Sequence, residues 1–314
     1  MFAIFLAITP VFILIAVGYA AVSQNYVKPS LGEALNAYAV KIAVPVLLFR
    51  AMATLDFGQA FSLPLLASFY IGAFACFALG IMGAQTLFGR RPGESVAIGF
   101  GATFSNSVLL GIAIVERSHG QAALIPTFGI IAFHASSIYT VGMVTMELMR
   151  RDGRPMGATL AAAGKSIIAN PLMIGILAGV AYNFSNVPLF DPFDTATQML
   201  AASAIPAALV GIGASMTQYR MASGLRESAM IAFLSLIIHP LIVFVLAHHV
   251  FQLDQIMTLA AVTIAAMPPG VNIYIFAAMY KRAEDVAASA FLLSTLLSIV
   301  SVTAWLWLLQ TYVT

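Results

Sequence analysis

Two apolar stretches of the sequence contain residue types that interrupt a helix. They read GFGATFSNSVLLGIAI (99–114) and AAMPPGVNIYIF (265–276). The Pro-Pro-Gly run of the second stretch removes two backbone donors and clashes with the preceding turn, so a helix must break there. The helix that resumes after a break presents free N–H groups and the positive end of its dipole, which together can bind an anion. The predicted chemistry is therefore non-covalent anion binding, with a plain proline kink as the alternative.

Polar residues near these breaks are the first candidates for contacting such an anion. The second half-helices should start near Ser107 and Gly270, and Asn106 is a suitable N-cap residue for the first of them. Asn272 follows the second break. Lys41 lies about 15 Å into its own apolar stretch, where anion binding, snorkelling and structural pairing are alternatives. No acidic residue lies at the centre of an apolar stretch, which favours an anionic ligand over a cationic one.

The elements that hold these residues are predicted to be membrane-spanning helices. Of the 314 residues, 61% are hydrophobic and only 8% are charged, against about 25% charged residues in soluble domains. This composition excludes a cytosolic globular enzyme and intrinsic disorder. The 14 basic and 12 acidic residues nearly balance, which argues against a nucleic-acid partner. Because Cys76 is the single cysteine, a disulfide framework and a cysteine-based metal site are excluded, and we expect no cofactor.

Ten apolar segments are long enough to cross a bilayer, which takes about 20 residues each. We interpret them as helices rather than barrel strands, because backbone polar groups must be paired in lipid. The first segment is interpreted as a retained helix and not as a cleaved signal. The predicted spans are 2–22, 31–53, 61–87, 93–115, 121–148, 160–182, 193–218, 225–250, 255–279 and 286–312.

Basic residues fall mainly on one side of this arrangement, which the positive-inside rule assigns to the cytoplasm. The opposite side holds only Arg50 and Arg117. With ten spans, both termini then lie on the side of the membrane opposite the cytoplasm. The loop 149–159 is the predicted cytoplasmic linker between the halves 1–148 and 160–314. The residues on the basic side are Lys28, Arg90, Arg91, Arg150, Arg151, Arg154, Lys165, Arg220, Arg226, Lys281 and Arg282.

The two halves carry the signs of an internal repeat, although chance matches between prolines are an alternative. Each half has five spans, an odd number, so the halves cross the membrane in opposite senses. Inverted repeats with paired interruptions are typical of secondary transporters, whose binding site lies at the interruptions. The corresponding pairs are Pro10 and Pro171, Gly18 and Gly179, and Pro45 and Pro206, each 161 residues apart.

Three stretches are similar to motifs of the auxin efflux carrier family, in its bacterial branch. LNAYAVKIAVPVLLF (35–49) resembles the signature I/L-N-x-F/Y-V-x-x-x-A-x-P-x-L-L-F. SNSVLLGIAI (105–114) resembles P-N-T/S-x-x-x-G-I-P, and MPPGVNIYIFAAMYKRAEDVAASA (267–290) resembles L-P-x-G-x-x-x-F-x-F-A-x-x-Y. Ser105 and Ala113 stand where many members have proline. We therefore expect glycine and polar side chains to hold the crossover of this chain.

The resemblance implies an all-α integral membrane fold of ten helices in a 5+5 inverted repeat, with broken, crossing helices 4 and 9. This is an elevator fold like that of the bile acid symporters, with a scaffold part and a moving transport part. The resemblance also implies a secondary active transporter of small organic anions in a bacterial inner membrane, with both termini in the periplasm. Bacterial relatives are linked to malonate, malate and similar carboxylates, and plant members to auxin-like acids.

His134 lies in the middle of the fifth span, and the resemblance aligns it with a polar position that faces the substrate pocket. A satisfied core histidine is the alternative, and a structural role is expected for His239. The predicted crossover residues are Ser105, Gly111, Pro268 and Pro269. The predicted substrate-binding residues are Asn106, Ser107, His134, Ser137, Gly270, Asn272 and Lys41.

Three other functions fit the sequence less well. A sodium-coupled organic-anion symporter of the bile-acid-transporter type needs a carboxylate among its sodium ligands, and no such residue is visible in the spans. An intramembrane enzyme should carry H-E-x-x-H, G-x-S-x-G or paired intramembrane aspartates, and these are absent. A sensor should add a soluble domain. The sequence leaves open which anion is moved, in which direction, with protons, sodium or no coupling, and whether the protein is a homodimer.

Overall fold

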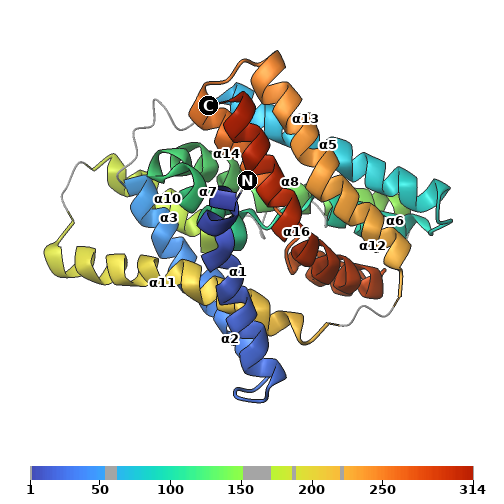
Figure 1. The fold of residues 1–314 in the computed structure, drawn as a ribbon, viewed down its shortest axis with the longest axis horizontal. Helices are drawn as coiled ribbons and strands as arrows, with labels where there is room; N and C mark the ends of the chain where they lie inside the picture. The colour runs from blue at the N-terminus through green and yellow to red at the C-terminus, as the bar shows by residue number, and fades with distance from the viewer. Residues whose placement is uncertain (1, 54–61, 151–170, 186–188, 220–222, 314) are drawn as a thin grey trace.

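A computed structural model describes residues 2–53, 62–150, 171–185, 189–219 and 223–313. Apart from one isolated bridge, the elements within these ranges are helices (Figure 1). The α-helices are α1 (Phe2–Ser23), α2 (Leu31–Tyr38), α3 (Val44–Ala53), α5 (Leu63–Thr86), α6 (Pro92–Thr103), α7 (Ile112–His119), α8 (Leu124–Arg150), α10 (Pro171–Asn183), α11 (Asp191–Met216), α12 (Leu225–Phe233), α13 (His239–Phe244), α14 (Gln255–Ala265), α15 (Asn272–Tyr280) and α16 (Glu284–Tyr312).

The prediction of an all-α fold is confirmed, and six continuous helices are long and apolar enough to cross a membrane. Three of these six contain or adjoin short turns of π-helix or 3-10 helix. The turn Ala39–Ala43 joins α2 to α3, for example, and makes one continuous span. The predicted linker 149–159 and the start of the sixth predicted span lie largely outside the described residues.

The fourth and ninth predicted spans are not among these six because both are interrupted, as the sequence predicts. The α6 helix ends at Thr103, and the chain is helical again from Ser107, first as a π-helical turn and then as α7. The α14 helix ends at Ala265 and α15 begins at Asn272. Each predicted span is therefore two half-helices joined by a non-helical connection.

Local interactions fix where the first interrupted helix begins and ends. Pro92 occupies the first turn of α6, where its missing N–H group costs nothing. The Glu94 carboxylate accepts a hydrogen bond from the Arg91 backbone N–H at 3.2 Å. At the other end, the Thr103 hydroxyl donates to the Ala73 carbonyl of α5 at 2.6 Å. The last turn of α6 is thus tied to a neighbouring helix just before the break.

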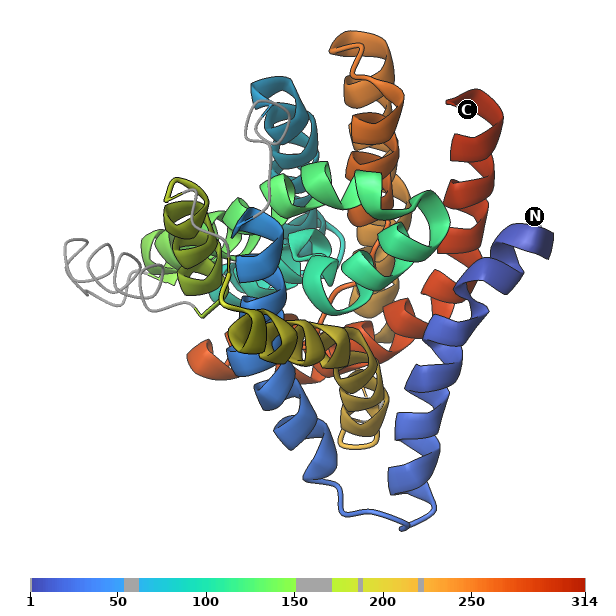
Figure 2. The same cartoon turned by 90° about the vertical axis from the view of Figure 1, so that its left-hand side faces the viewer.

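The helices pack into two groups. In the first group, α1, α2 and α3 pack with α10 and α11. In the second group, α5, α6 and α8 pack with α12, α13, α14, α15 and α16. Figure 1 shows the first group at the lower left and the second at the upper right, and Figure 2 shows the loop between α1 and α2 at the bottom, far from both termini.

Hydrogen bonds and an ion pair connect several of the basic loops at one end of the molecule. The Gln218 side chain donates to the Pro29 carbonyl at 2.7 Å, which ties the end of α11 to the loop between α1 and α2. Arg90, before α6, pairs with Glu227 of α12 at 2.6 Å, and this hydrogen-bonded carboxylate raises the pKa of Arg90. The Ser223 hydroxyl donates to the Asp285 carboxylate, which lowers the pKa of Asp285.

We predict that Gly18→Ala destabilises the first helix group. A Cβ atom at this position would lie 2.0 Å from the Val210 carbonyl oxygen of α11, so the two helix backbones would have to separate. Overpacking of this kind costs about 1–3 kcal/mol, which should appear as a lower thermal unfolding midpoint in detergent. Gly101→Ala is the matched control, because its new Cβ would meet only the flexible end of Ile231 at 3.2 Å. Equal midpoints for the two variants would contradict the prediction.

Candidate functional site

The connections within the two interrupted spans cross and pair their backbones. The Asn106 N–H donates to the Pro268 carbonyl at 2.8 Å. Ser105 and Pro269 form an isolated antiparallel β-bridge. An unpaired buried backbone group costs about as much as a lost hydrogen bond, so this pairing offsets part of the cost of breaking two helices. All four crossover positions of the sequence analysis therefore lie at or next to the crossing, with Gly111 closing the π-helical turn that follows.

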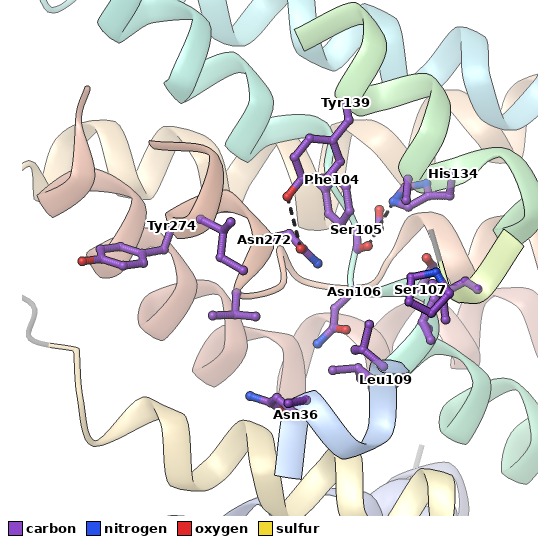
Figure 3. Close-up of a pocket in the computed structure, with 18 of the residues that line it drawn as sticks. Asn36, Phe104, Ser105, Asn106, Ser107, Leu109, His134, Tyr139, Asn272 and Tyr274 are labelled. Atoms are coloured by element: carbon purple, nitrogen blue, oxygen red, sulfur yellow. Dashed lines mark hydrogen bonds between the residues drawn. The ribbon is translucent and has the colours of Figure 1, made fainter. Parts of the chain in front are cut away.

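A cavity of about 700 Å³ adjoins the crossing. Its walls come from α2, α8, the end of α11, the start of α15 and the crossing itself, as Figure 3 shows for the labelled residues. Of the predicted substrate-binding residues, the lining includes Lys41, Asn106, Ser107, His134 and Asn272. The lining includes Ser136 rather than Ser137, and Gly270 lies behind Asn106.

Asn106 occupies the N-cap position that the sequence predicts, but its side chain makes no capping hydrogen bond. Its backbone carbonyl instead accepts from the N–H groups of Leu110, at 3.3 Å, and Gly111, at 3.0 Å. The hydrogen bond from Gly111 spans five residues of the chain, which is the spacing of a π-helical turn. Because capping does not use the amide, the Asn106 side chain can serve a ligand in the cavity.

His134 holds the crossing from the side of α8. Its Nε2 atom lies 3.1 Å from the Ser105 carbonyl oxygen. The ring is only 2% exposed and makes edge contacts with Phe69 of α5 and with Phe104, at centroid distances of 5.6 and 4.9 Å. His134 is thus at once a wall of the cavity and a backbone contact of the connection that crosses it, two roles that the sequence analysis treated as alternatives.

An aromatic cluster packs behind the crossing and orients Asn272. The Phe100 ring of α6 stacks on the Phe276 ring of α15, with centroids 3.9 Å apart and an interplanar angle of 4°. Tyr139 of α8 packs edge-on against Phe100, and its hydroxyl donates to Asn272 Oδ1 at 3.2 Å (Figure 3). The Asn272 amide nitrogen is then the end of that side chain left for other partners.

Apart from Lys41, the wall opposite the crossing consists of residues that the sequence analysis did not single out. Asn36 of α2 donates through Nδ2 to Ser215 Oγ of α11 at 2.8 Å. Lys41 and Glu33 are the charged residues of the lining. The sequence did contain a feature that could have identified Asn36, because this residue is the asparagine of the family-like motif in 35–49. Ser215 carries no local signal, since only the packing of α11 on α2 brings it to the cavity.

Comparison with known proteins gives two matches. A family model described as "Membrane transport protein" matches residues 3–306 of the chain. A protein of Rhizobium meliloti (strain 1021) named "Putative malonate transporter" is 25% identical over 288 residues, which cover 89% of this chain and 88% of the relative. Both matches therefore extend over the crossing and over both helix groups.

We predict that Phe276→Ala destabilises the protein by about 3–5 kcal/mol, the usual cost of emptying a buried phenylalanine site. Phe276 is fully buried, and its stack on Phe100 joins the two interrupted spans. The thermal unfolding midpoint of the purified variant measures the effect. Met279→Ala on the same helix is the control, since Met279 is 53% exposed. A midpoint that falls no further for Phe276→Ala than for this control would rule out a structural role for the stack.

Proposed function

The chain belongs to the membrane transport protein family, that of the auxin efflux carriers, and on this basis we propose that it is a secondary active transporter of small organic anions. Membership makes the protein a multi-pass membrane transporter and not an enzyme. The name of the Rhizobium meliloti relative supports malonate as the first anion to test. Malate and auxin-like acids are the other anions of the proposed class.

The observation that carries the proposal is the helix start that faces the cavity at the crossing. The first hydrogen bonds of this helix come from Leu110 and Gly111, and residues 107–109 precede them. The first N–H groups of a helix have no partner within it, and residues 107–109 all line the cavity. Free N–H groups at the positive end of a helix dipole favour a bound anion.

The size and lining of the cavity support a small ligand held by a few polar groups. A volume of about 700 Å³ is within the range of small-molecule sites. We propose that Asn106, Ser107 and Asn272 contact the anion and that His134 and Lys41 flank it. Ser137 and Gly270 remain proposed members of the site, acting through their neighbours Ser136 and Asn106.

Two equivalent helix contacts support an inverted repeat of residues 1–148 and 160–314. Gly18 of α1 packs against the Val210 carbonyl of α11, where an added Cβ would lie 2.0 Å away. Gly179 of α10 packs against the Phe49 carbonyl of α3, where the distance would be 2.4 Å. The two glycines are 161 residues apart, and so are their partners Phe49 and Val210. This is the spacing of the sequence repeat. One contact is thus the counterpart of the other in the opposite half.

The proposed mechanism is elevator-type alternating access between the two helix groups. The crossing belongs to the second group, and α2 and the end of α11 in the first group form the facing wall of the cavity. Movement of the second group along the first would carry an anion bound at the crossing past a stationary wall. The first group, which contains the closest glycine contacts, is the proposed scaffold.

We further propose a bacterial inner membrane as the location, with the basic loops in the cytoplasm and both termini in the periplasm. The contacts among the loops that carry Arg90, Glu227, Asp285 and Pro29 support a common side for these loops. Arg50, on the other predicted side, pairs with Asp194 at 2.6 Å. The positive-inside rule then gives the orientation.

Uptake of labelled malonate into proteoliposomes, with and without an imposed pH gradient, tests the proposal. We expect uptake by the native protein and at least a tenfold loss in Asn106→Ala, with an unchanged thermal midpoint because the Asn106 amide caps no helix. Asn183→Ala is the converse control. It loses hydrogen bonds to the Met52 and Ala53 carbonyls, so stability should fall while uptake per folded protein is retained. Stimulation by the gradient would indicate proton coupling, and stimulation by sodium would favour the symporter alternative.

Pro269→Ala tests whether the break in the ninth span matters for movement rather than for binding. The substitution restores a backbone donor at the crossing and should allow the break to close in part. We expect the turnover rate to fall several-fold more than the affinity for malonate, measured as initial uptake over a range of concentrations. A parallel loss of affinity and folded protein would instead assign Pro269 a purely structural role.

A further inference from the structure

Three buried polar atoms on one wall of the cavity have no hydrogen-bond partner among the residues that the structure describes. They are His134 Nδ1, Ser105 Oγ and Ser107 Oγ, and their residues are 2%, 2% and 1% exposed. All three residues line the cavity, and Figure 3 shows them at the same side of it. Buried polar groups are nearly always hydrogen-bonded, so three orphaned atoms at one wall indicate a group that is supplied by the ligand.

The contact at the other nitrogen of His134 determines what its Nδ1 atom can do. The Ser105 carbonyl oxygen only accepts hydrogen bonds, so Nε2 must carry the proton. Among the described residues, the rings in contact with His134 are Phe69 and Phe104, and neither offers a counter-charge for an imidazolium. The ring is therefore the neutral tautomer protonated at Nε2, and its Nδ1 atom is an acceptor that requires a donor.

The two serines supply the complementary chemistry. Ser105 lies in the non-helical connection that is bridged to Pro269, and Ser107 begins the helical turn that follows it. Both serines line the cavity with His134. A hydroxyl both donates and accepts and turns freely about its bond, so these serines can bond to an oxygen whose own proton goes to His134.

We propose that His134, Ser105 and Ser107 form a subsite that selects a hydrogen-bond donor on the substrate, either a hydroxyl or a protonated carboxyl group. The inference rests on the proposed function, in which an organic anion occupies this cavity. Its carboxylate binds at Asn106 and the helix start, and its O–H group faces Nδ1 of His134. A dicarboxylate is then carried as the monoanion, with its protonated carboxyl group at His134. An ionised carboxylate or an ester in that place would be repelled, because its oxygen lone pair would face the lone pair of Nδ1.

Two pairs of ligands that differ in this donor test the inference by binding to the purified protein. Malonamate ends in an amide N–H group, whereas monomethyl malonate ends in an ester that only accepts. The pair 3-hydroxybutyrate and butyrate differs by one hydroxyl. We expect at least tenfold tighter binding of the donor-bearing member of each pair, measured by thermal shift titration at a single pH. Equal binding within both pairs, or no binding of any of the four, would overturn the inference.

His134→Phe should reduce the ratio of the two affinities within each pair to nearly one, because the substitution removes the acceptor and keeps an aromatic ring. His239→Phe is the matched control: His239 is fully buried, contacts the same Phe69 ring at a centroid distance of 5.1 Å, and is not among the residues that line the cavity. The control should retain the native preference. A preference that persists in His134→Phe would place the donor selection elsewhere and refute the assignment. If labelled malonate is not taken up but the donor-bearing acids still bind more tightly, the proposed substrate fails and the subsite stands.

Discussion

The need to pair backbone polar groups inside a membrane is the constraint on which the rest of this structure depends. Two spans are broken, and a broken helix leaves N–H and C=O groups without their intrahelical partners. The chain resolves this by bringing both breaks to one place, where Asn106 bonds to Pro268 and Ser105 bridges Pro269. Each break thus supplies part of what the other lacks, which explains why the interruptions come as a pair.

The pairing at the crossing is incomplete, and the incomplete part carries the proposed function. The backbone donors at residues 107–109 precede the first hydrogen bond of their helix, and these residues line the cavity. A fully paired crossing would be a structural kink with nothing to offer a ligand. His134 completes the pairing of the Ser105 carbonyl from α8, and the Phe100–Phe276 stack supports the same region from behind. The donors are therefore held in place by a rigid surrounding.

Both helix groups contain close contacts between glycines and backbones, and the second group adds an aromatic cluster at the crossing. In the first group, small residues let backbones touch, as Gly18 does with Val210 and Gly179 with Phe49. Close backbone packing of this kind is typical of helix association in lipid. In the second group, Gly99 of α6 packs in the same way against the Phe77 carbonyl of α5, and aromatic side chains fill the space around the crossing. A frame with the closest backbone contacts, beside a second group that carries the site, is compatible with the proposed elevator movement.

The sequence by itself determined the helical class, the two breaks and most residues around them, because proline chemistry and apolar run length act locally. It also selected Asn106, Ser107, His134 and Asn272, which line the cavity. It did not determine that the Asn106 amide leaves its helix uncapped, because a π-helical turn replaces the expected one. Nor could it choose Ser136 over Ser137, since the rotation of α8 about its axis is set by packing. Only the tertiary structure brought Asn36 and Ser215 together from 179 residues apart, because contacts between distant helices depend on how whole surfaces fit.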